Sequence, residues 1–363
     1  MRTETRRFLA AAGAVVFTLG IAGTQTAAVA ASAVESLYAD LARLSPEERH
    51  KKIVEGALKE GALTTHPAFR GKVGSGHVAL FKKRYPTIKL QTSDMNTEAA
   101  VETFIAEETA GRHLTDAIGV TVPDMNIVLR KELAARNPTP FVDAILPRYA
   151  GFKDPENRWI PWYWSEHGVS YNPTVVKAEE APNSYEDLCN PRFKGQVSYE
   201  PGETKWLIGM YLYFGEEKFK DWLTCVAKND PVVMKGHDLR VQLMFAGDHS
   251  IQGDNFFYAA YSANSKNPRK APFAIAYGAP VMSRAGVTAI NVNAPHPYGA
   301  ALWADWHLTD ESQQYIYDEF RGPLTMKHPY LKDDTTLFVF GLVSEEVTKK
   351  VNDYWRDIVG KKR

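Results

Sequence analysis

Strand-like and helix-like segments alternate along most of this chain, and the alternation limits its fold more than any other feature. In the first half, a helix is predicted to begin after an N-cap at Ser45 and to end at Gly61. The elements that follow it are strand 63–66, helix 78–85, strand 88–92, a helix capped by Asn96, and strand 116–122. This order predicts βαβ units and a mostly parallel sheet, with ligand sites at the carboxyl ends of its strands.

The same alternation resumes after an aromatic, proline-containing segment at residues 159–164, which we interpret as a crossing between two lobes. The chain is also too long for one hydrophobic core. We therefore predict an α/β protein of two lobes, each a mostly parallel sheet flanked by helices, joined by two crossing strands. The elements of the second half are strands 196–199, 232–234 and 250–252, helices 204–214, 216–228 and 238–245, and a return strand at 286–292. The predicted boundaries are 1–31 for a signal peptide, 32–158 for lobe 1, 159–278 for lobe 2, 279–325 for a return to lobe 1, and 326–363 for a C-terminal helical segment that packs on lobe 2.

The N-terminal segment has the three parts of a secretory signal. Arg2, Arg6 and Arg7 precede an uncharged run at residues 8–30, which ends in small residues. We expect a cleaved signal peptide and a periplasmic protein, exported by the twin-arginine or the general secretory route. Because no second run approaches the roughly 18 to 20 apolar residues of a membrane span, we expect no stable membrane insertion.

Charge and cysteine content narrow the classes of partner. The 43 basic residues equal the 43 acidic ones, so the sequence offers no general attraction to nucleic acid or anionic lipid. Two cysteines, Cys189 and Cys225, are too few for a disulfide scaffold and lack metal-site spacing. In an oxidising compartment they form either one disulfide or two buried thiols, and the sequence leaves both open.

The common enzyme motifs are missing from the sequence, which has no Gly-x-Ser-x-Gly elbow, His-Glu-x-x-His pair or phosphate-binding Gly-x-x-x-x-Gly-Lys loop. The glycine-rich run at 71–76 has the wrong spacing for a dinucleotide fingerprint, and we predict a flexible loop there. We predict a protein that is not an enzyme and has no cofactor, with a secreted enzyme on the same fold as an alternative.

Four phrases in order along the chain resemble the periplasmic solute-binding proteins of ABC importers, in their two-lobed type II class. They lie at residues 53–61, 81–89, 184–195 and 294–297. The resemblance implies a monomer that closes by hinge motion over a small solute and delivers it to a permease and its ATPase.

Within that class the chain is most similar to the ferric-ion-binding branch, where two consecutive tyrosines on a lobe-2 loop hold the metal with a histidine and a glutamate. Here the matching loop reads Asp254-Asn255-Phe256-Phe257-Tyr258, and phenylalanine has no oxygen for Fe(III). The histidine position falls near Arg70. We therefore predict no metal site, and keep a ferric ion held by Tyr258 and Tyr261 as an alternative.

The groups that replace the iron ligands suit a small organic anion such as a carboxylate, phosphate or phosphonate. Arg70 would pair with it, helix starts would offer backbone N–H groups, and aromatic residues would form apolar walls or belong to the core. Glu166 beside Trp164 would instead fit a cation in an aromatic box. The predicted ligand-binding residues are His66, Arg70, Ser93, Asn96, Trp164, Glu166, Thr204, Lys205, Trp206, Arg240, Asp254, Asn255 and Phe256.

Overall fold

The computed structural model describes residues 31–201, 203–267 and 270–360, and all of the predicted signal peptide except Ala31 lies outside this part of the chain. The residues from Ser32 onward form one compact unit. Within the described residues, none of the helices combines the length and the apolar character needed to span a bilayer.

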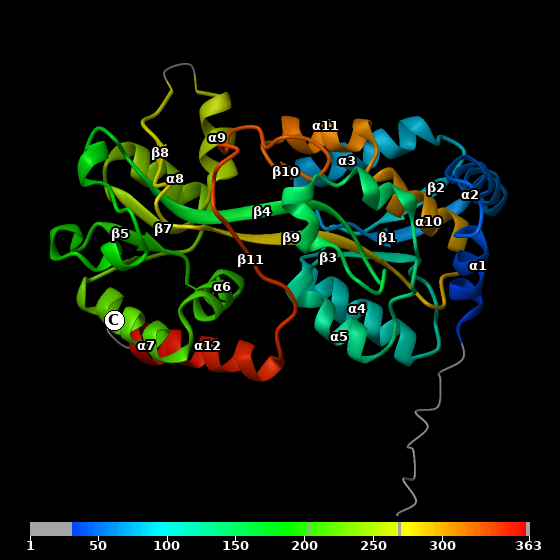
Figure 1. Cartoon of the computed structure of the whole chain (residues 1–363), viewed down its shortest axis with the longest axis horizontal. Coiled ribbons are helices and arrows are strands. Elements are labelled where there is room, and N and C mark those ends of the chain that lie inside the picture. The colour runs from blue at the N-terminus through cyan, green and yellow to red at the C-terminus, as the bar shows by residue number, and fades with distance from the viewer. Residues whose placement is uncertain (1–30, 202, 268–269, 361–363) are drawn as a thin grey trace, which may run out of the picture. The chain divides into compact units, whose positions relative to one another are not determined.

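Lobe 1 is built on three parallel strands in the order β2, β1, β3, with helices on both sides (Figure 1). Helix α2 begins at a capping box, in which Ser45 and Glu48 bond each other's backbone N–H groups, and ends at Gly61 with φ of +67°. Both ends are therefore where the sequence predicts them. The elements of this lobe are α1 (Ala33–Leu41), α2 (Pro46–Glu60), β1 (Ala62–His66), α3 (Gly71–Arg84), β2 (Lys89–Thr92), α4 (Thr97–Thr109), β3 (Ala117–Thr121), α5 (Met125–Arg130), α10 (Pro297–Trp306) and α11 (Asp310–Asp318).

The glycine-rich run at 71–76 is not the flexible loop that the sequence predicts, because it forms the first turns of α3. Its glycines allow close packing of this helix. A Cβ atom on Gly74 would lie 2.3 Å from the carbonyl oxygen of Phe69, and one on Gly76 would lie 2.3 Å from the Tyr315 hydroxyl of α11. The run therefore reflects contact with neighbouring elements and not chain flexibility.

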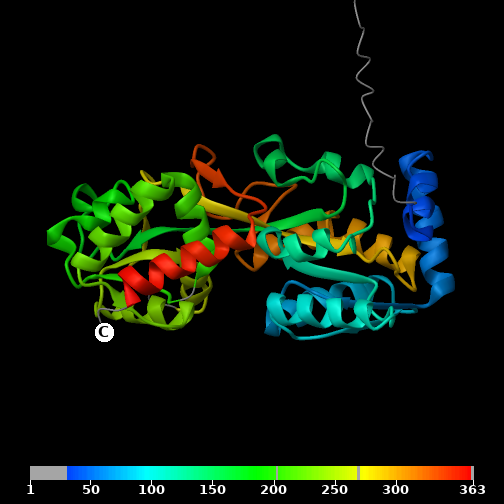
Figure 2. The same cartoon turned by 90° about the horizontal axis from the view of Figure 1, so that it is seen from below.

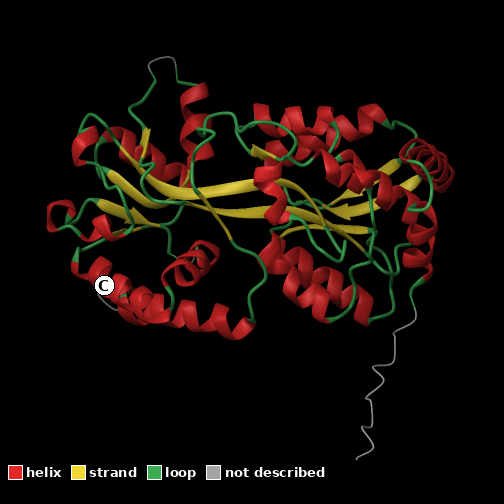
Figure 3. Cartoon of the chain, in the orientation of Figure 1, coloured by secondary structure: helices red, strands yellow, loops and turns green. Residues whose placement is uncertain are grey.

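Two long antiparallel strands join the lobes: β4 (Ile160–Tyr171) leads from lobe 1 to lobe 2, and β9 (Val281–Ile290) returns (Figures 1 and 3). Each residue of both strands is buried. Strand β9 pairs with β3 of lobe 1, and β4 pairs with β7 of lobe 2, so the described strands make one sheet in the order β2-β1-β3-β9-β4-β7-β5-β6. Residues 160–164 of the aromatic segment are thus part of a continuous strand.

Lobe 2 repeats the parallel arrangement, with β5 between β6 and β7, and encloses a second hydrophobic core. Helix α12, which crosses the face of this lobe that is turned to the viewer in Figure 2, packs against α6 and α7 and contributes Val351 and Trp355 to that core. The remaining helices and strands are β5 (Val197–Tyr199), α6 (Thr204–Phe214), α7 (Glu216–Lys228), β6 (Val232–Val233), α8 (His237–Ala246), β7 (Ile251–Phe256), α9 (Phe257–Ser265), β8 (Ala274–Ile275), β10 (Gly322–Pro323), β11 (Leu337–Val339) and α12 (Glu345–Ile358). Short 3-10 helices lie at Val122–Asp124, Pro140–Ala144, Pro147–Phe152, Ala178–Glu180, Glu186–Cys189 and Pro191–Phe193.

A disulfide joins Cys189 to Cys225 on α7, with the two Cα atoms 5.6 Å apart. The bond ties the short helix Glu186–Cys189 to α7, 36 residues further along the chain. Trp222 of α7 covers the same junction and donates a hydrogen bond to the Tyr185 carbonyl at 3.0 Å. The disulfide is therefore part of the internal support of lobe 2.

Replacing both Cys189 and Cys225 by Ala is expected to lower the free energy of unfolding by about 2 to 4 kcal/mol, because the bond restricts the unfolded chain over a loop of this length. Urea unfolding with and without a reducing agent measures the effect. Reduced wild type should match the variant, and the variant should not respond to reduction. A wild-type curve that ignores the reductant would show that the two thiols are not bonded.

Candidate functional site

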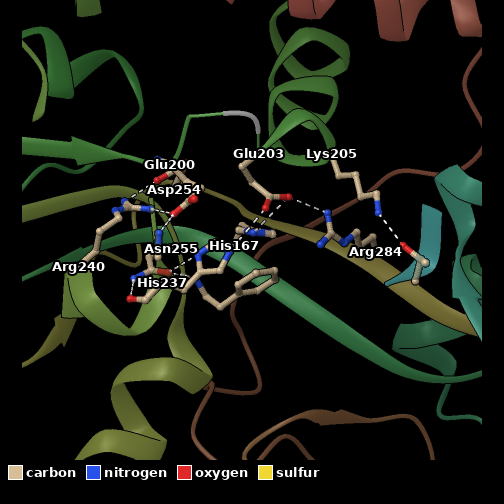
Figure 4. Close-up of polar contacts among 12 residues, drawn as sticks. His167, Glu200, Glu203, Lys205, His237, Arg240, Asp254, Asn255 and Arg284 are labelled. Carbon is tan, nitrogen blue, oxygen red and sulfur yellow. Dashed lines mark hydrogen bonds and ion pairs between the residues drawn. The ribbon is translucent and has the colours of Figure 1, made fainter. Parts of the chain in front are cut away.

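Lys205, in the first turn of α6, reaches from lobe 2 to lobe 1 (Figure 4). Its Nζ atom lies 2.9 Å from a carboxylate oxygen of Asp124 and 3.0 Å from one of Glu98 at the start of α4. Burial alone would raise the pKa of Asp124, but the Lys205 ammonium holds it below its usual range. This pair is an ionic contact between the lobes, and it marks where their facing surfaces meet.

Glu203, directly before α6, is the centre of a polar cluster to which β4, β9 and α8 also contribute (Figure 4). One carboxylate oxygen lies 3.1 Å from Nη1 of Arg284 on β9 and 3.8 Å from Nε2 of His167 on β4. The other lies 3.7 Å from Nε2 of His237, the first residue of α8. We call Glu203, His167, His237 and Arg284 the Glu203 cluster.

The two histidines of the Glu203 cluster are uncharged at neutral pH. Burial, reinforced by the Arg284 charge, lowers the pKa of His167 well below its ordinary value, and burial also lowers that of His237. The Asn255 Oδ1 atom accepts a hydrogen bond at 3.0 Å from Nδ1 of His237 and so fixes the orientation of that ring. A neutral imidazole presents one N–H donor and one nitrogen acceptor, which suits recognition of a polar, uncharged group.

A row of two aromatic rings flanked by two arginines lies next to this cluster. The rings of Phe256 and Tyr258 have centroids 4.9 Å apart. The Arg284 guanidinium is 5.5 Å from the Phe256 ring, and the Arg321 guanidinium is 3.3 Å from the Tyr258 ring. We call these four residues the arginine–aromatic row. Its Arg321 end touches lobe 1, because the Arg321 guanidinium is also 5.6 Å from the ring of Phe69.

Arg321 carries a charge that no carboxylate balances at close range. Among the described residues, none places a carboxylate oxygen within 4.0 Å of its guanidinium, and its buried Nε atom has no hydrogen-bond partner. The buried Nε of Arg284 is likewise without a partner in the described part of the chain. A half-buried arginine with no carboxylate in contact is costly, and Glu166 acts on its charge only from beyond 4.0 Å, so this end of the row is suited to receive an anion.

Arg240 and Asp254, both predicted to contact the solute, bind each other inside lobe 2. Arg240 is 0% exposed and donates to Asp254 at 2.5 Å and to the Ser198 carbonyl at 2.9 Å. Burial raises the pKa of Asp254 to about 7, although the neighbouring Arg240 charge lowers it. The prediction that Arg240 holds the anion does not fit this geometry, because its guanidinium is occupied by groups of its own lobe.

The aromatic walls predicted from the sequence are mostly core residues. Trp164 and Trp206 are 0% exposed and belong to the cores of lobe 1 and lobe 2 respectively. Buried Trp162 stacks on His77 and His307. Phe256 is the predicted wall residue that lies in the arginine–aromatic row. It is the last residue of strand β7 and is not on a loop.

The predicted residues His66, Arg70, Ser93 and Asn96 contact other residues of lobe 1. His66 lies 2.5 Å from the Ser93 hydroxyl, and Asn96 caps α4 by accepting a hydrogen bond from Ala99 at 2.8 Å. Arg70 is exposed, and its nearest carboxylate partner is Asp94 at 3.9 Å. Ser93, Asp94 and Phe69 line a pocket of about 320 Å³. Phe69 is thus the residue through which this pocket adjoins Arg321.

The remaining predicted residues have structural partners. Thr204 donates to Asn352 of α12 at 2.7 Å, and Tyr261 stacks on Tyr330 with centroids 3.8 Å apart. Glu166 is fully buried and accepts hydrogen bonds from the Tyr258 backbone N–H at 3.0 Å and from the Tyr330 hydroxyl. Because Glu166 already bonds protein groups beneath the row, it supports Tyr258 and does not form a box for a cation.

Sequence reasoning missed the residues that organise this region: Glu203, His167, His237, Arg284 and Arg321. One signal was available, since Arg284 is a charged residue in a mostly apolar stretch, two positions before the predicted return strand 286–292. Charged side chains are seldom fully buried unless paired, so such a position calls for a partner. The other four residues are recognised by the elements that they contact. The spacing of residues along the chain does not reveal those contacts.

The chain matches the family model described as bacterial extracellular solute-binding protein over residues 128–337. Its fold is similar to that of iron-bound HitA from Pseudomonas aeruginosa, at 17% identity and a TM-score of 0.70, covering 82% of this chain and 99% of that one. It is also similar to Trichodesmium IdiA (FutA) with iron and citrate, at 17% identity and a TM-score of 0.67, covering 83% and 100%. AfuA from Actinobacillus pleuropneumoniae with bound fructose-6-phosphate matches at 16% identity and a TM-score of 0.62, covering 83% and 99%. No curated protein sequence matches the chain. At these identities the structural likeness shows the fold, and it confirms the predicted two-lobed architecture.

Replacing Glu166 by Gln tests the electrostatics beneath the row. Burial raises the pKa of Glu166 to about 7, above the ordinary 4.5, although the Tyr330 hydroxyl lowers it. Folding therefore favours the protonated acid, whose stabilising contribution is complete below about pH 4.5 and is lost as pH rises through about 7. Glu166→Gln is expected to be more stable than wild type by about 2 to 3 kcal/mol at pH 8, and nearly equal to it at pH 4.5.

Urea unfolding of both proteins at the two pH values measures this difference. Asp254 titrates near the same pH in wild type and variant, so its effect cancels in the comparison. His328, whose Nε2 is 3.9 Å from Glu166, stays neutral because burial lowers its pKa to about 3. A gain of equal size at both pH values would mean that the charge of Glu166 is not its cause.

Proposed function

The chain belongs to the bacterial extracellular solute-binding protein family, and from that premise we propose that it captures a small organic anion between its lobes for delivery to an ABC permease. The carboxylate, phosphate or phosphonate of this solute binds at the arginine–aromatic row. The protein acts in the periplasm and makes or breaks no covalent bond. Its partners are the permease and the ATPase of the importer.

The observation that supports the anion most strongly is Arg321, a half-buried cation without a carboxylate partner among the described residues. A guanidinium matches the two oxygens of a carboxylate or phosphate in geometry as well as in charge. Arg321 also lies between Phe69 of lobe 1 and Tyr258 of lobe 2. An anion bound there would contact both lobes, which is how a solute favours the closed state over the open one.

The rest of the interface fits closure by a hinge. Strands β4 and β9 are the long connections between the lobes, and the Lys205 pair with Asp124 forms only when the lobes are close. The aromatic rings of the row supply apolar surface for the body of an organic solute. Charge, apolar surface and a contact between the lobes thus occur together.

A ferric ion held with an anion is the second candidate, because HitA and IdiA (FutA) have this fold and their structures contain iron. Tyr258 is placed to meet an interlobe ligand. Tyr261, however, stacks on Tyr330 instead of joining it. The Arg321 guanidinium beside the Tyr258 ring would oppose a trivalent cation, so we favour the organic anion.

The test is a binding measurement on wild type and Arg321→Gln, after unfolding and refolding to remove any bound solute. The solutes are hydroxy acids, dicarboxylates, phosphate esters, phosphonates and ferric citrate, screened by thermal shift and then titrated by calorimetry. A solute at 100 times its Kd is expected to add about 2.7 kcal/mol of stability to wild type. Arg321→Gln should weaken its binding by roughly 30-fold or more, since about 2 kcal/mol follows from removing a buried charged contact.

The control is Arg43→Gln, which removes an exposed arginine paired with Asp40 of the same lobe. It should bind as wild type does. Arg70→Gln separates the two arginine hypotheses: loss of binding there with full binding in Arg321→Gln would place the anion at Arg70 and overturn the assignment to Arg321. A shift with iron salts alone, in the absence of any organic acid, would favour the ferric-ion function.

A further inference from the structure

His167 is a buried polar residue whose hydrogen-bonding capacity the protein does not use. It is 0% exposed, and neither ring nitrogen has a hydrogen-bond partner among the described residues. The nearest carboxylate oxygen, on Glu203, is 3.8 Å away, too far for a hydrogen bond. Buried donors and acceptors are nearly always satisfied, so a missing partner at this position calls for a group that the polypeptide does not supply.

The position of His167 connects it to the arginine–aromatic row. Its ring centroid is 3.7 Å from that of Phe256, which in turn adjoins Tyr258. Figure 4 shows its ring directed toward the Glu203 carboxylate, beside His237. Glu203 and His237 keep some contact with solvent, with side-chain exposures of 14% and 27%. A solute at the row therefore extends naturally toward this cluster.

The chemistry of the cluster selects the kind of group that fits. The Glu203 carboxylate would repel a second acid group. Arg284, 3.1 Å from Glu203, already pairs with this carboxylate and would repel an ammonium group. A hydroxyl group carries no charge and both donates and accepts. It can donate to Glu203 or to an imidazole nitrogen while accepting from an imidazole N–H. Neutral histidines beside a carboxylate are thus matched to a hydroxyl.

We propose that the solute is a hydroxylated organic acid or phosphate ester, whose acid group binds Arg321 and whose hydroxyl binds His167 and Glu203. This inference rests on the proposed function, since it assigns the second end of a solute held at the same row. The Phe256 and Tyr258 rings, with centroids 4.9 Å apart, separate Arg321 from His167. The solute therefore carries its hydroxyl some atoms away from the acid group, as in polyol phosphates and sugar acids.

Matched pairs of solutes test the inference: glycerol 3-phosphate against propyl phosphate, and malate against succinate. Each pair differs by hydroxyl groups and keeps the acid. Wild type is expected to bind the hydroxylated member at least about 10-fold more tightly, because a site built around a hydroxyl rejects an analogue that leaves its polar groups unpaired. The measurement is Kd by calorimetry for all four solutes.

His167→Phe removes both ring nitrogens and keeps a ring against Phe256. In this variant the preference for the hydroxylated member should fall to about 2-fold or less, while the Kd for propyl phosphate or succinate stays within about 3-fold of wild type. His167→Gln, which restores a donor and an acceptor, should recover part of the preference. A residue with a purely structural role would change the Kd for both members of a pair equally.

The outcomes separate this inference from the function beneath it. If no acid binds wild type, the organic-anion function itself fails. If both members of each pair bind with equal affinity, the function stands and the hydroxyl assignment is overturned. Tighter binding of aspartate than of malate would also overturn it, since the cluster would then accept an ammonium. If His167→Phe does not fold, the Kd values of wild type for the two members of each solute pair still test the hydroxyl assignment.

Discussion

The antiparallel pairing of β4 with β9 is the interaction on which the candidate site depends. The two strands run through both lobes, and their register sets Ser165 opposite Arg284 and His167 opposite Met282. Cross-strand partners share a face of the sheet, so Arg284 and His167 project to the same side and reach Glu203 together. Glu166, one residue along, projects to the other side and meets Tyr330 and His328. A shift of one residue in this register would exchange the two environments.

The distribution of charge between the lobes follows from that arrangement. Arg240 and Lys205 each have carboxylate partners, Asp254 within lobe 2 and Asp124 across the interface. Arg284 shares Glu203 with two histidines, and Arg321 faces aromatic rings. The cations that stabilise the structure, Arg240 and Lys205, are thus neutralised by carboxylates. The charges of the two arginines beside the row are less fully compensated. Such unequal pairing is a physical mark of a site that is completed by something else.

Much of the fold follows from local sequence signals, because those signals act over a few residues. The capping box at Ser45, the glycine at 61 and the cap at Asn96 place helix ends where the structure has them. The glycine run at 71–76 leads to a wrong prediction of a flexible loop. Its small residues allow close contacts with Phe69 and Tyr315, and these contacts cannot be deduced from the sequence. The same limit applies to the site. From the sequence, Arg240 is predicted to bind the anion, but the structure pairs it with Asp254. Arg321 is not predicted as a site residue, and the structure places it beside the rings of Tyr258 and Phe69.

The path of the chain bears on how the protein is made. After returning to lobe 1 through β9, the chain goes back once more, and α12 completes the core of lobe 2 with Val351 and Trp355. Lobe 2 cannot close this part of its core until α12 has left the ribosome. During synthesis the apolar surface that α12 later covers therefore stays open to chaperones. A chain of an extracellular family thus carries an unfinished lobe 2 until this helix emerges.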